Sequence, residues 1–360
     1  MKYIESSGCS LEIGSLLDSS LLSLLLTEYT NSKKVIIVDD NTHEKCLGYL
    51  ITNFEVLSDA EVIQLPPGEE NKQISIAYGA WEAMTDYEID KYDVIINLGG
   101  GIITDMGGFI ASCYKRGCDY INIPTTLLSM VDASIGGKTG VNLGHHKNQI
   151  GLFSEPVKSY IDFSFLQTLP DEELKSGYAE MLKHGLISEK KLFFDVLDHM
   201  NSGFQSFDDD LIIRCIEVKN KIVSEDPREK GKRKILNFGH TIGHAIEGCF
   251  MSEKSLTHGH SIAIGMVMES FLSLKYGCLS QENYTAIENS ILAHYAIPKF
   301  NDSDIQQIIE IMKNDKKNRQ SKILCCFLQD FGSCSYDNEI NSKDFIEVFL
   351  HFNNLQINLN

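Results

Sequence analysis

The chain has 360 residues, of which 43% are hydrophobic, and its 32 basic residues stand against 50 acidic ones, for a net charge of −18. This length is enough to bury a large core and to form two domains. The acidic balance argues against nucleic acid and against an anionic membrane surface as partners. If the substrate is an anion, the lysines and arginines that bind it must be concentrated locally.

The cysteines and the N-terminus indicate a soluble, cytoplasmic protein. Ten cysteines are scattered without a CxxC pair, which is typical of reduced thiols. Polar residues follow Lys2 where a secretory signal would have an apolar stretch, and the apolar run 21–26 is too short to span a bilayer.

Three apolar runs in the first half predict strands that are buried on both faces. Val35–Val38, Val94–Ile96 and Tyr120–Ile123 are each followed by Asp, Gly or Thr residues. Continuous β-branched runs of this kind are typical of a parallel sheet. Ligands of such sheets bind beyond the carboxyl ends of the strands, where these polar residues fall.

The pattern changes at Pro170, after which helices predominate. Pro170 and three following acids favour a helix start. Further helices are predicted at about 209–224, 239–249 and 261–276. The fold class is therefore α/β, with an N-terminal Rossmann-like parallel-sheet domain at residues 1–169 and a mainly α-helical domain at residues 170–360.

Two glycine-rich loops are candidates for binding phosphate groups. Gly99–Gly101, followed by Asp105, could bring backbone amides close to a pyrophosphate, but it lacks the GxGxxG spacing and also suits a tight turn. The second loop is Asp132–Lys138, with Lys147 and Asn148 beyond it. It suits an oxyanion or a flexible surface loop. A P-loop is rejected because Ala133 stands near the place of the required glycine.

Histidines at three positions predict a metal site in the second half. His240 and His244 are four residues apart and so lie on one face of a helix. His258 could return to the same place, and Glu180 offers an oxygen ligand. Three protein ligands with an open position are typical of a catalytic metal. The alternative is that the two helical histidines are hydrogen-bonded core residues or a helix cap.

Taken together, these blocks resemble the 3-dehydroquinate synthase family from about Asp39 to Lys317. The motifs agree with the family in order, spacing and identity. They are Leu98–Gly101 with Asp105, Tyr114–Gly117, Pro124–Leu128, Asp132–Lys138, Lys147–Asn148, Thr168–Pro170, Ala179–Lys183, Asn237–His244, His258–Gly259 and Asp315–Lys317.

The resemblance implies NAD and a divalent metal, zinc or cobalt, on Glu180, His240 and His258. It implies these dinucleotide-binding residues: Asp39, Asn41, Glu69, Lys72, Gly100, Gly101, Ile102, Asp105, Thr125, Thr126, Lys138, Lys147, Phe165, Leu166, Gln167 and Thr168. It implies these substrate-binding residues: Arg116, Asp132, Lys138, Asn148, Lys183, Lys219, Arg233, Asn237, His244, Lys316 and Lys317. The implied catalytic residues are Glu229, His244, Lys183 and Asp132. Arg116 matches an arginine that reaches the neighbouring subunit, so a homodimer is implied.

The implied activity is a carbon–oxygen lyase reaction of the shikimate pathway, which leads to chorismate and the aromatic amino acids. The substrate, 3-deoxy-D-arabino-heptulosonate 7-phosphate, becomes 3-dehydroquinate and phosphate through transient oxidation, elimination, reduction and aldol closure. NAD is regenerated in each turnover. The substrate is a small molecule that carries a carboxylate and a phosphate, and Arg233 could take the carboxylate bidentately.

Two departures and three alternatives accompany this interpretation. The loop before His258, from Cys249 to Thr257, is slightly longer than the family pattern leads us to expect. His260 stands where the family usually has Glu, and cyclases acting on sedoheptulose phosphate can carry histidine there. A cyclase such as 2-deoxy-scyllo-inosose synthase uses a substrate without a carboxylate and would leave Arg233 and Lys219 unpaired. Polyol or glycerol dehydrogenases would release NADH. A non-catalytic regulator would bind NAD and metal without turnover.

Overall fold

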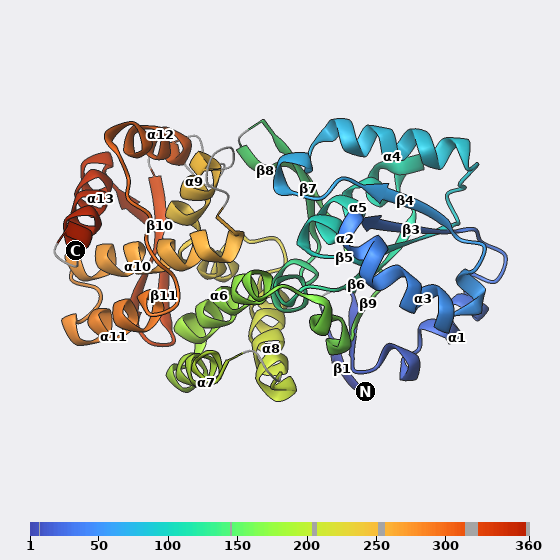
Figure 1. Ribbon diagram of the computed structural model, residues 1–360, viewed down its shortest axis with the longest axis horizontal. Coiled ribbons are helices and arrows are strands. Elements are labelled where there is room, and N and C mark those ends of the chain that lie inside the picture. Colours follow the sequence, from blue (N-terminus) through green and yellow to red (C-terminus); the bar gives the residue numbers. More distant parts are fainter. Residues whose placement is uncertain (7, 145, 204–206, 251–255, 314–322, 358–360) are drawn as a thin grey trace. The chain divides into compact units, whose positions relative to one another are not determined.

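The computed structural model describes residues 1–6, 8–144, 146–203, 207–250, 256–313 and 323–357 (Figure 1). The chain forms two compact units. The first consists of Met1–Gly177 and Lys219–Arg228, and the second of Tyr178–Val218 and Glu229–Asn360. The return of residues 219–228 to the first unit has no counterpart in the predicted division at residue 169.

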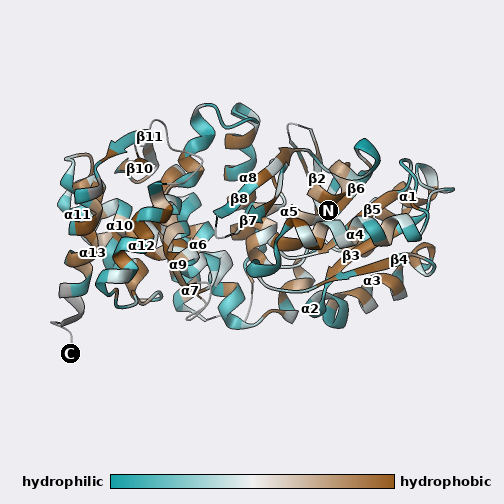
Figure 2. Cartoon of the chain, turned by 90° about the horizontal axis from the view of Figure 1, so that it is seen from above, coloured by the Kyte–Doolittle hydropathy of each residue, from teal (hydrophilic) through white to brown (hydrophobic). Residues whose placement is uncertain are grey.

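A seven-stranded sheet forms the centre of the first unit. Its strands, in spatial order, are β1 (Lys2–Glu5), β2 (Ser10–Ile13), β9 (Lys158–Ile161), β6 (Asp119–Pro124), β5 (Val94–Gly99), β3 (Lys34–Asp39) and β4 (Glu61–Leu65). Every neighbouring pair is parallel except β1 with β2. Figure 2 shows hydrophobic residues along these strands, and all of β5 is buried. The predicted Rossmann-like parallel sheet is confirmed.

The strand order reverses between β3 and β5. From β3 the chain moves outward to β4, and it then returns to place β5 on the other side of β3, followed by β6 and β9. Such a reversal is a topological switch point, where parallel sheets bind their ligands beyond the carboxyl ends of the strands. Asp39 ends β3 and Gly99 ends β5, so the first predicted glycine loop lies at the switch point.

Helices and one hairpin surround this sheet. The longer elements are α1 (Leu21–Thr27), α3 (Gly48–Asn53), α4 (Ile74–Asp86), α5 (Gly101–Cys113), β7 (Lys138–Leu143) and β8 (His146–Phe153). The short ones are η1 (Leu16–Asp18), α2 (Asp40–Thr42), η2 (His43–Leu47), η3 (Glu55–Leu57), η4 (Glu69–Asn71), η5 (Tyr114–Arg116), η6 (Ser129–Ala133) and η7 (Phe163–Thr168). Helix α5 approaches the sheet closely: a Cβ on Gly107 would lie 2.1 Å from Oδ1 of Asn97. A larger residue at position 107 would therefore force either the buried Asn97 side chain or α5 to shift.

The second unit is mainly helical, as predicted. Helix α6 (Asp171–Ser188) continues into it from the first unit. The further elements are α7 (Lys190–Asn201), α8 (Asp209–Glu225), η8 (Lys232–Asn237), α9 (His240–Phe250), α10 (His258–Lys275), α11 (Gln281–Leu292), α12 (Asp302–Lys313), β10 (Ile323–Asp330), β11 (Ser333–Ile340) and α13 (Ser342–Ile357). The antiparallel pair β10–β11 was not predicted, although its first strand is a buried apolar run.

Helices α9 and α10 approach each other through glycines. A Cβ on Gly265 of α10 would lie 1.9 Å from the carbonyl oxygen of Gly239, just before α9. Gly239 itself has a φ of +80°, which side chains other than glycine rarely adopt. Because His240 and His258 begin these two helices, the close packing fixes the distance between the histidines.

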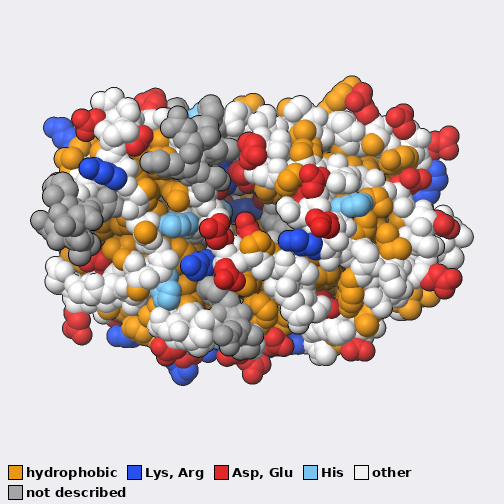
Figure 3. Space-filling model, viewed as in Figure 1, with side chains coloured by type: hydrophobic (Ala, Val, Ile, Leu, Met, Phe, Trp, Pro, Cys, Tyr) orange, Lys and Arg blue, Asp and Glu red, His pale blue; other side chains and the backbone are white. Residues whose placement is uncertain are grey.

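Acidic side chains are spread over the face of the molecule seen in Figure 3, in keeping with the net charge of −18. All ten cysteines are free thiols. In the described part of the chain, no helix combines the length and apolar character needed to cross a membrane.

Candidate metal and dinucleotide sites

The three predicted metal ligands come together within the second unit. Glu180 lies on α6 and is fully buried, while His240 and His258 are the first residues of α9 and α10. The Nε2 atoms of His240 and His258 each lie 3.5 Å from the same oxygen, Oε1 of Glu180. Three donor atoms of types that zinc prefers therefore converge from three helices. Lys183 donates a hydrogen bond to the other carboxylate oxygen of Glu180.

The other ring nitrogen of each histidine has an acceptor nearby. Nδ1 of His240 lies 3.1 Å from the carbonyl oxygen of Phe238, and Nδ1 of His258 lies 3.1 Å from Oε2 of Glu247. A carbonyl and a carboxylate can only accept, so each Nδ1 is the protonated nitrogen. Both Nε2 atoms then direct a lone pair toward the place beside Glu180, as in metal sites whose histidines are oriented by outer acceptors.

A buried carboxylate on α10 holds the start of α9. Glu269 accepts hydrogen bonds from the backbone N–H groups of Gly239 at 2.9 Å, Thr241 at 3.0 Å and Ile242 at 3.2 Å. These amides have no acceptor within their own helix, and a carboxylate also suits the positive end of its dipole. Glu269 thus fixes the turn that carries His240.

Neither Glu247 nor Glu269 was predicted as part of the site. For Glu247 the sequence held a signal, because it follows His240 by seven residues and His244 by three, on the same face of α9. For Glu269 it held none, since the contact joins two helices.

His244 offers a second way to complete a metal site. Its ring centroid lies 5.0 Å from that of His240 and 5.6 Å from that of His258. One nitrogen from each of the three histidines lies within 4.8 Å of the others, so three imidazoles could also share an ion. The position of Glu180, at 3.5 Å from two Nε2 atoms, favours the ligand set with the carboxylate.

His260, which departs from the family pattern, points away from these ligands. Its Nε2 lies 2.7 Å from the carbonyl oxygen of Ala296, and its ring packs edge-on against Tyr295. The carboxylate beside His258 comes from Glu247 instead.

Most of the predicted dinucleotide residues follow the carboxyl ends of strands in the first unit. Asp39 ends β3 and caps α2, with Oδ1 accepting from the backbone N–H of Thr42 at 2.8 Å. Asn41 is exposed on α2. Gly100 is the N-cap of α5, and Gly101 and Ile102 begin that helix, whose first N–H groups form an anion-binding end.

The threonines after β6 lie near the same loop. The backbone N–H of Thr125 donates to the carbonyl oxygen of Gly99 at 3.0 Å, and Thr126 bonds with Ser129. The Thr125 hydroxyl is buried and has no hydrogen-bond partner among the residues that the structure describes. Buried hydroxyls are nearly always satisfied, so a ligand at this edge would supply the partner.

The segment Phe165–Thr168 forms most of η7, just after β9. Phe165 and Leu166 are buried, with the Phe165 ring edge-on to Tyr49 at 5.6 Å. Gln167 is exposed, and Thr168 donates to the carbonyl oxygen of Phe165 at 2.8 Å.

Predicted residues from three separate segments are joined by one network in the first unit. Nζ of Lys72 donates to Asp105 at 2.6 Å and to Oδ1 of Asn148 at 2.7 Å. Lys147 pairs with Glu69 at 3.3 Å. Burial raises the pKa of the Asp105 carboxyl, and the ammonium of Lys72 opposes that rise. The loop after β4, helix α5 and hairpin β7–β8 are thereby linked.

The remaining substrate and catalytic candidates are placed as follows. Lys219 donates to the carbonyl oxygen and to Oδ1 of Asp132, both at 2.6 Å. Asn237 donates to Oε1 of Glu229 at 2.6 Å, and the backbone of Glu229 is left-handed, with φ +53°. Lys138 and Arg116 are exposed. Lys316 and Lys317 lie outside the described residues.

The buried cations of the described residues are all among the predicted binding residues. In the described ranges, the buried lysines and arginines are Lys72, Lys183, Lys219 and Arg233, each 6% exposed or less. Burying a cation is costly unless it is paired or has a functional role. Lys183, Lys219 and Arg233 were predicted to bind the anionic substrate, and Lys72 was predicted to bind the dinucleotide.

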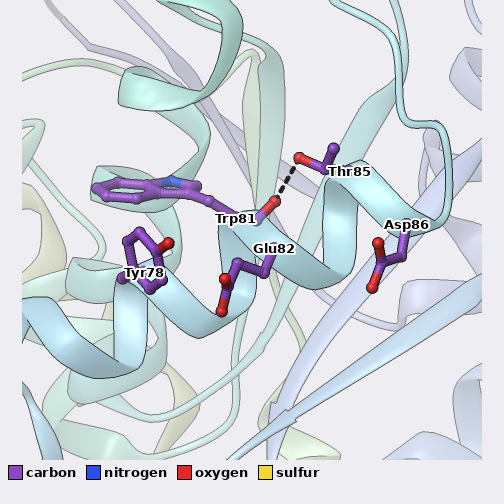
Figure 4. A pocket seen from close by; sticks show the side chains of 5 residues that line it. All are labelled: Tyr78, Trp81, Glu82, Thr85 and Asp86. Atoms are coloured by element: carbon purple, nitrogen blue, oxygen red, sulfur yellow. Dashed lines mark hydrogen bonds between the residues drawn. The ribbon is translucent and has the colours of Figure 1, made fainter.

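A separate surface hollow lies on the outer side of α4. Tyr78, Trp81, Glu82, Thr85 and Asp86 line it, and Thr85 bonds to the Trp81 carbonyl oxygen (Figure 4). Two of the five residues are acids and none is a cation, so this hollow does not suit an anionic substrate.

Comparison with known proteins agrees with the motifs. The model of the 3-dehydroquinate synthase N-terminal domain matches residues 62–176, and that of the C-terminal domain matches residues 177–318. This chain belongs to the 3-dehydroquinate synthase family. The 3-dehydroquinate synthase of Parabacteroides distasonis is 38% identical over 334 residues, covering 91% of this chain and 93% of that protein. That of Thermodesulfovibrio yellowstonii is 38% identical over 345 residues, covering 92% and 95%.

Solved structures show the fold shared by this 3-dehydroquinate synthase family member. A 2-epi-5-epi-valiolone synthase from Streptomyces hygroscopicus, solved with NAD+ and Zn2+, superposes with a TM-score of 0.83 at 23% identity, covering 98% of each chain. A 2-deoxy-scyllo-inosose synthase, solved with carbaglucose-6-phosphate, NAD+ and Co2+, gives a TM-score of 0.80 at 24% identity, covering 97% of this chain and 99% of the other.

Proposed function

We propose that this chain converts 3-deoxy-D-arabino-heptulosonate 7-phosphate into 3-dehydroquinate and inorganic phosphate, using NAD+ and a divalent zinc or cobalt ion. This is the shikimate-pathway step toward chorismate and the aromatic amino acids. The observation that carries the proposal is the convergence of two Nε2 atoms on one oxygen of buried Glu180, in a chain of the 3-dehydroquinate synthase family.

The donor set fits a catalytic metal. Two imidazoles and one carboxylate are a common three-ligand zinc set, which leaves one position for substrate oxygens. The acceptors on both Nδ1 atoms, Phe238 O and Glu247, support this, because they leave each Nε2 lone pair for a metal. We propose Glu180, His240 and His258 as the ligands.

The switch-point edge fits a dinucleotide. The start of α5 offers backbone N–H groups for a pyrophosphate. The Thr125 hydroxyl, which has no partner among the described residues, can bond to a ligand there. We propose that NAD+ binds at this edge, with the network of Glu69, Lys72 and Asp105 beside it.

When bound, the metal would polarise substrate hydroxyls, and NAD+ would take up and later return one hydride. The chain's own residues bind and orient the substrate. The guanidinium of Arg233 matches a carboxylate in geometry and charge. Lys138, Asn148, Lys183 and Lys219 are proposed as further polar contacts of the anionic substrate.

Proton transfer is assigned to four polar side chains of the chain. His244 lies with its ring 5.0 Å from that of His240, and Glu229 is held by Asn237. Both side-chain types can accept and return protons near neutral pH when their surroundings tune them. Lys183 and Asp132 complete the proposed catalytic set.

A homodimer and a cytoplasmic location are also proposed. The left-handed backbone of Lys115 and Arg116, with φ values of +46° and +70°, turns an exposed arginine to the surface. An exposed arginine suits the role of reaching an anion in a second copy. The ten free thiols accord with a reducing compartment.

The test of this function follows phosphate and NADH together. The full chain receives zinc, the seven-carbon substrate and NAD+ in an amount far below the substrate. We expect phosphate release to exceed the NAD+ supplied, with no net rise in NADH absorbance, and we expect a chelator to stop it. Added zinc should restore the rate after chelation. NADH formed in step with substrate loss would instead indicate a dehydrogenase and contradict the proposal.

A further inference from the structure

Asn142 is a buried amide that none of the predicted roles includes. It lies in β7, is 3% exposed, and makes hydrogen bonds to three of the predicted ligand-binding residues. Its backbone N–H donates to the carbonyl oxygen of Lys72 at 2.7 Å. Its Nδ2 donates to Oε1 of Glu69 at 2.8 Å, and its Oδ1 accepts from the backbone N–H of Asn148 at 2.8 Å.

The surroundings allow only one orientation of this amide. Glu69 presents two acceptors, its carboxylate at 2.8 Å and its backbone carbonyl at 3.2 Å, so the NH2 group must face it. Asn148 presents an N–H donor, so the oxygen must face that side. A flipped amide would set donor against donor and acceptor against acceptor. Both ends of the side chain are therefore used at once.

The two residues that Asn142 holds are tied to other parts of the network. Asn148 has a left-handed backbone, with φ +51°, a region that asparagine adopts more readily than most residues other than glycine. The bond from its N–H to Asn142 supports that conformation, in which its side-chain oxygen accepts from Lys72 at 2.7 Å. Glu69 is an anion whose Oε1 also faces Lys147 at 3.3 Å.

We infer that Asn142 is a positioning residue that orients Glu69 for the dinucleotide and Asn148 for the substrate through one side chain. The inference rests on the proposed function, which assigns these two residues to NAD+ and to the sugar-acid phosphate. Loss of this amide weakens binding of both ligands together, although Asn142 itself is not assigned to either.

Asn142→Asp is the sharpest variant, because it keeps the shape and removes the donor. At neutral pH its carboxylate would face Oε1 of Glu69 across the 2.8 Å now occupied by a hydrogen bond. Two carboxylates at that distance repel, and the pKa of one of them rises. When protonated, the new carboxyl can donate to Glu69 again. Asn142→Ala removes the side-chain hydrogen bonds to Glu69 and Asn148 without adding charge. It replaces Asn142→Asp as the test variant if the Asp variant does not fold.

The control is the same change at another buried amide of the first unit. Asn122 on β6 is 4% exposed and accepts from Nδ2 of Asn97 at 3.0 Å, within the sheet. Asn122→Asp therefore buries a carboxylate at similar depth, within the sheet. Calorimetric titration of NAD+ into the zinc-loaded full chain measures the Kd, and thermal unfolding is recorded for each variant.

We expect Asn142→Asp to raise the Kd of NAD+ about tenfold or more at pH 8.5, as loss of a charge-assisted hydrogen bond implies. At pH 6, the Kd of the Asn142→Asp variant should lie closer to the Kd of the unsubstituted chain. For Asn142→Ala, the ratio of its Kd to that of the unsubstituted chain should be the same at both pH values. Asn122→Asp should leave the Kd unchanged. An unchanged Kd in both Asn142 variants, with only a lower melting temperature, would overturn the inference. No NAD+ binding by the unsubstituted chain would contradict the proposed function itself, and the inference with it.

Discussion

Glu180→Gln is expected to remove the metal from the chain and to lower turnover by more than about 100-fold. Mutation of a residue that only orients a metal ligand typically lowers metal affinity or activity about 10–100-fold. Loss of a direct ligand is expected to exceed that range. The amide is a poor ligand, and the two Nε2 atoms now 3.5 Å from Oε1 lose their shared anion. Zinc content after dialysis and the rate of phosphate release measure the two effects.

The same change is expected to destabilise the metal-free chain by about 3–5 kcal/mol, because it removes one partner of the buried ion pair between Glu180 and Lys183. Lys183 is 1% exposed and donates to Glu180. The double variant Glu180→Gln with Lys183→Met should recover most of that stability but no zinc. Urea unfolding of the two variants separates folding from metal binding.

Glu172→Gln is the matched control, because Glu172 is exposed on the same helix. It should keep both zinc and turnover. Full zinc content in Glu180→Gln, with normal phosphate release, would contradict the proposed ligand set.

Gly265→Ala is expected to destabilise the second unit by about 3 kcal/mol, the upper part of the range for overpacking a core. The new Cβ would lie 1.9 Å from the carbonyl oxygen of Gly239 and 2.8 Å from the backbone nitrogen of Gly243. Backbone atoms cannot rotate away, so α9 and α10 must separate. His240 and His258 begin these helices, and zinc affinity should fall with stability.

Gly79→Ala provides the comparison on an exposed helix. A Cβ there has nothing within 4 Å, and Gly79 is exposed on α4. Alanine is preferred over glycine in helices, so this variant should be unchanged or up to about 1 kcal/mol more stable. A Gly265→Ala chain with the melting temperature and zinc affinity of the original would show that the two helices are not closely packed.

The parallel sheet and the helical second half were predictable because both depend on local patterns. Val35–Val38 and Val94–Ile96 are continuous apolar runs, and these became the buried centres of β3 and β5. That His240 and His244 lie on one face of a helix followed from their spacing of four residues alone. The role of Gly265 could not be predicted, because it depends on which helix packs against which.

The supporting residues were not predictable, since each acts between elements that the sequence does not place side by side. Glu269 reaches from α10 to the start of α9, and Asn142 joins β7 to the loop after β4. Strands β10 and β11 were missed because an apolar run such as 323–328 fits a buried helix or a strand equally well until its partner is known.

A crystal structure of the zinc-loaded chain, with anomalous diffraction at the zinc edge, is the decisive test of the proposed ligand set. We expect one ion with Nε2 of His240, Nε2 of His258 and a carboxylate oxygen of Glu180 at about 2.0–2.2 Å. An ion bound by His240, His244 and His258, with Glu180 turned away, would contradict it.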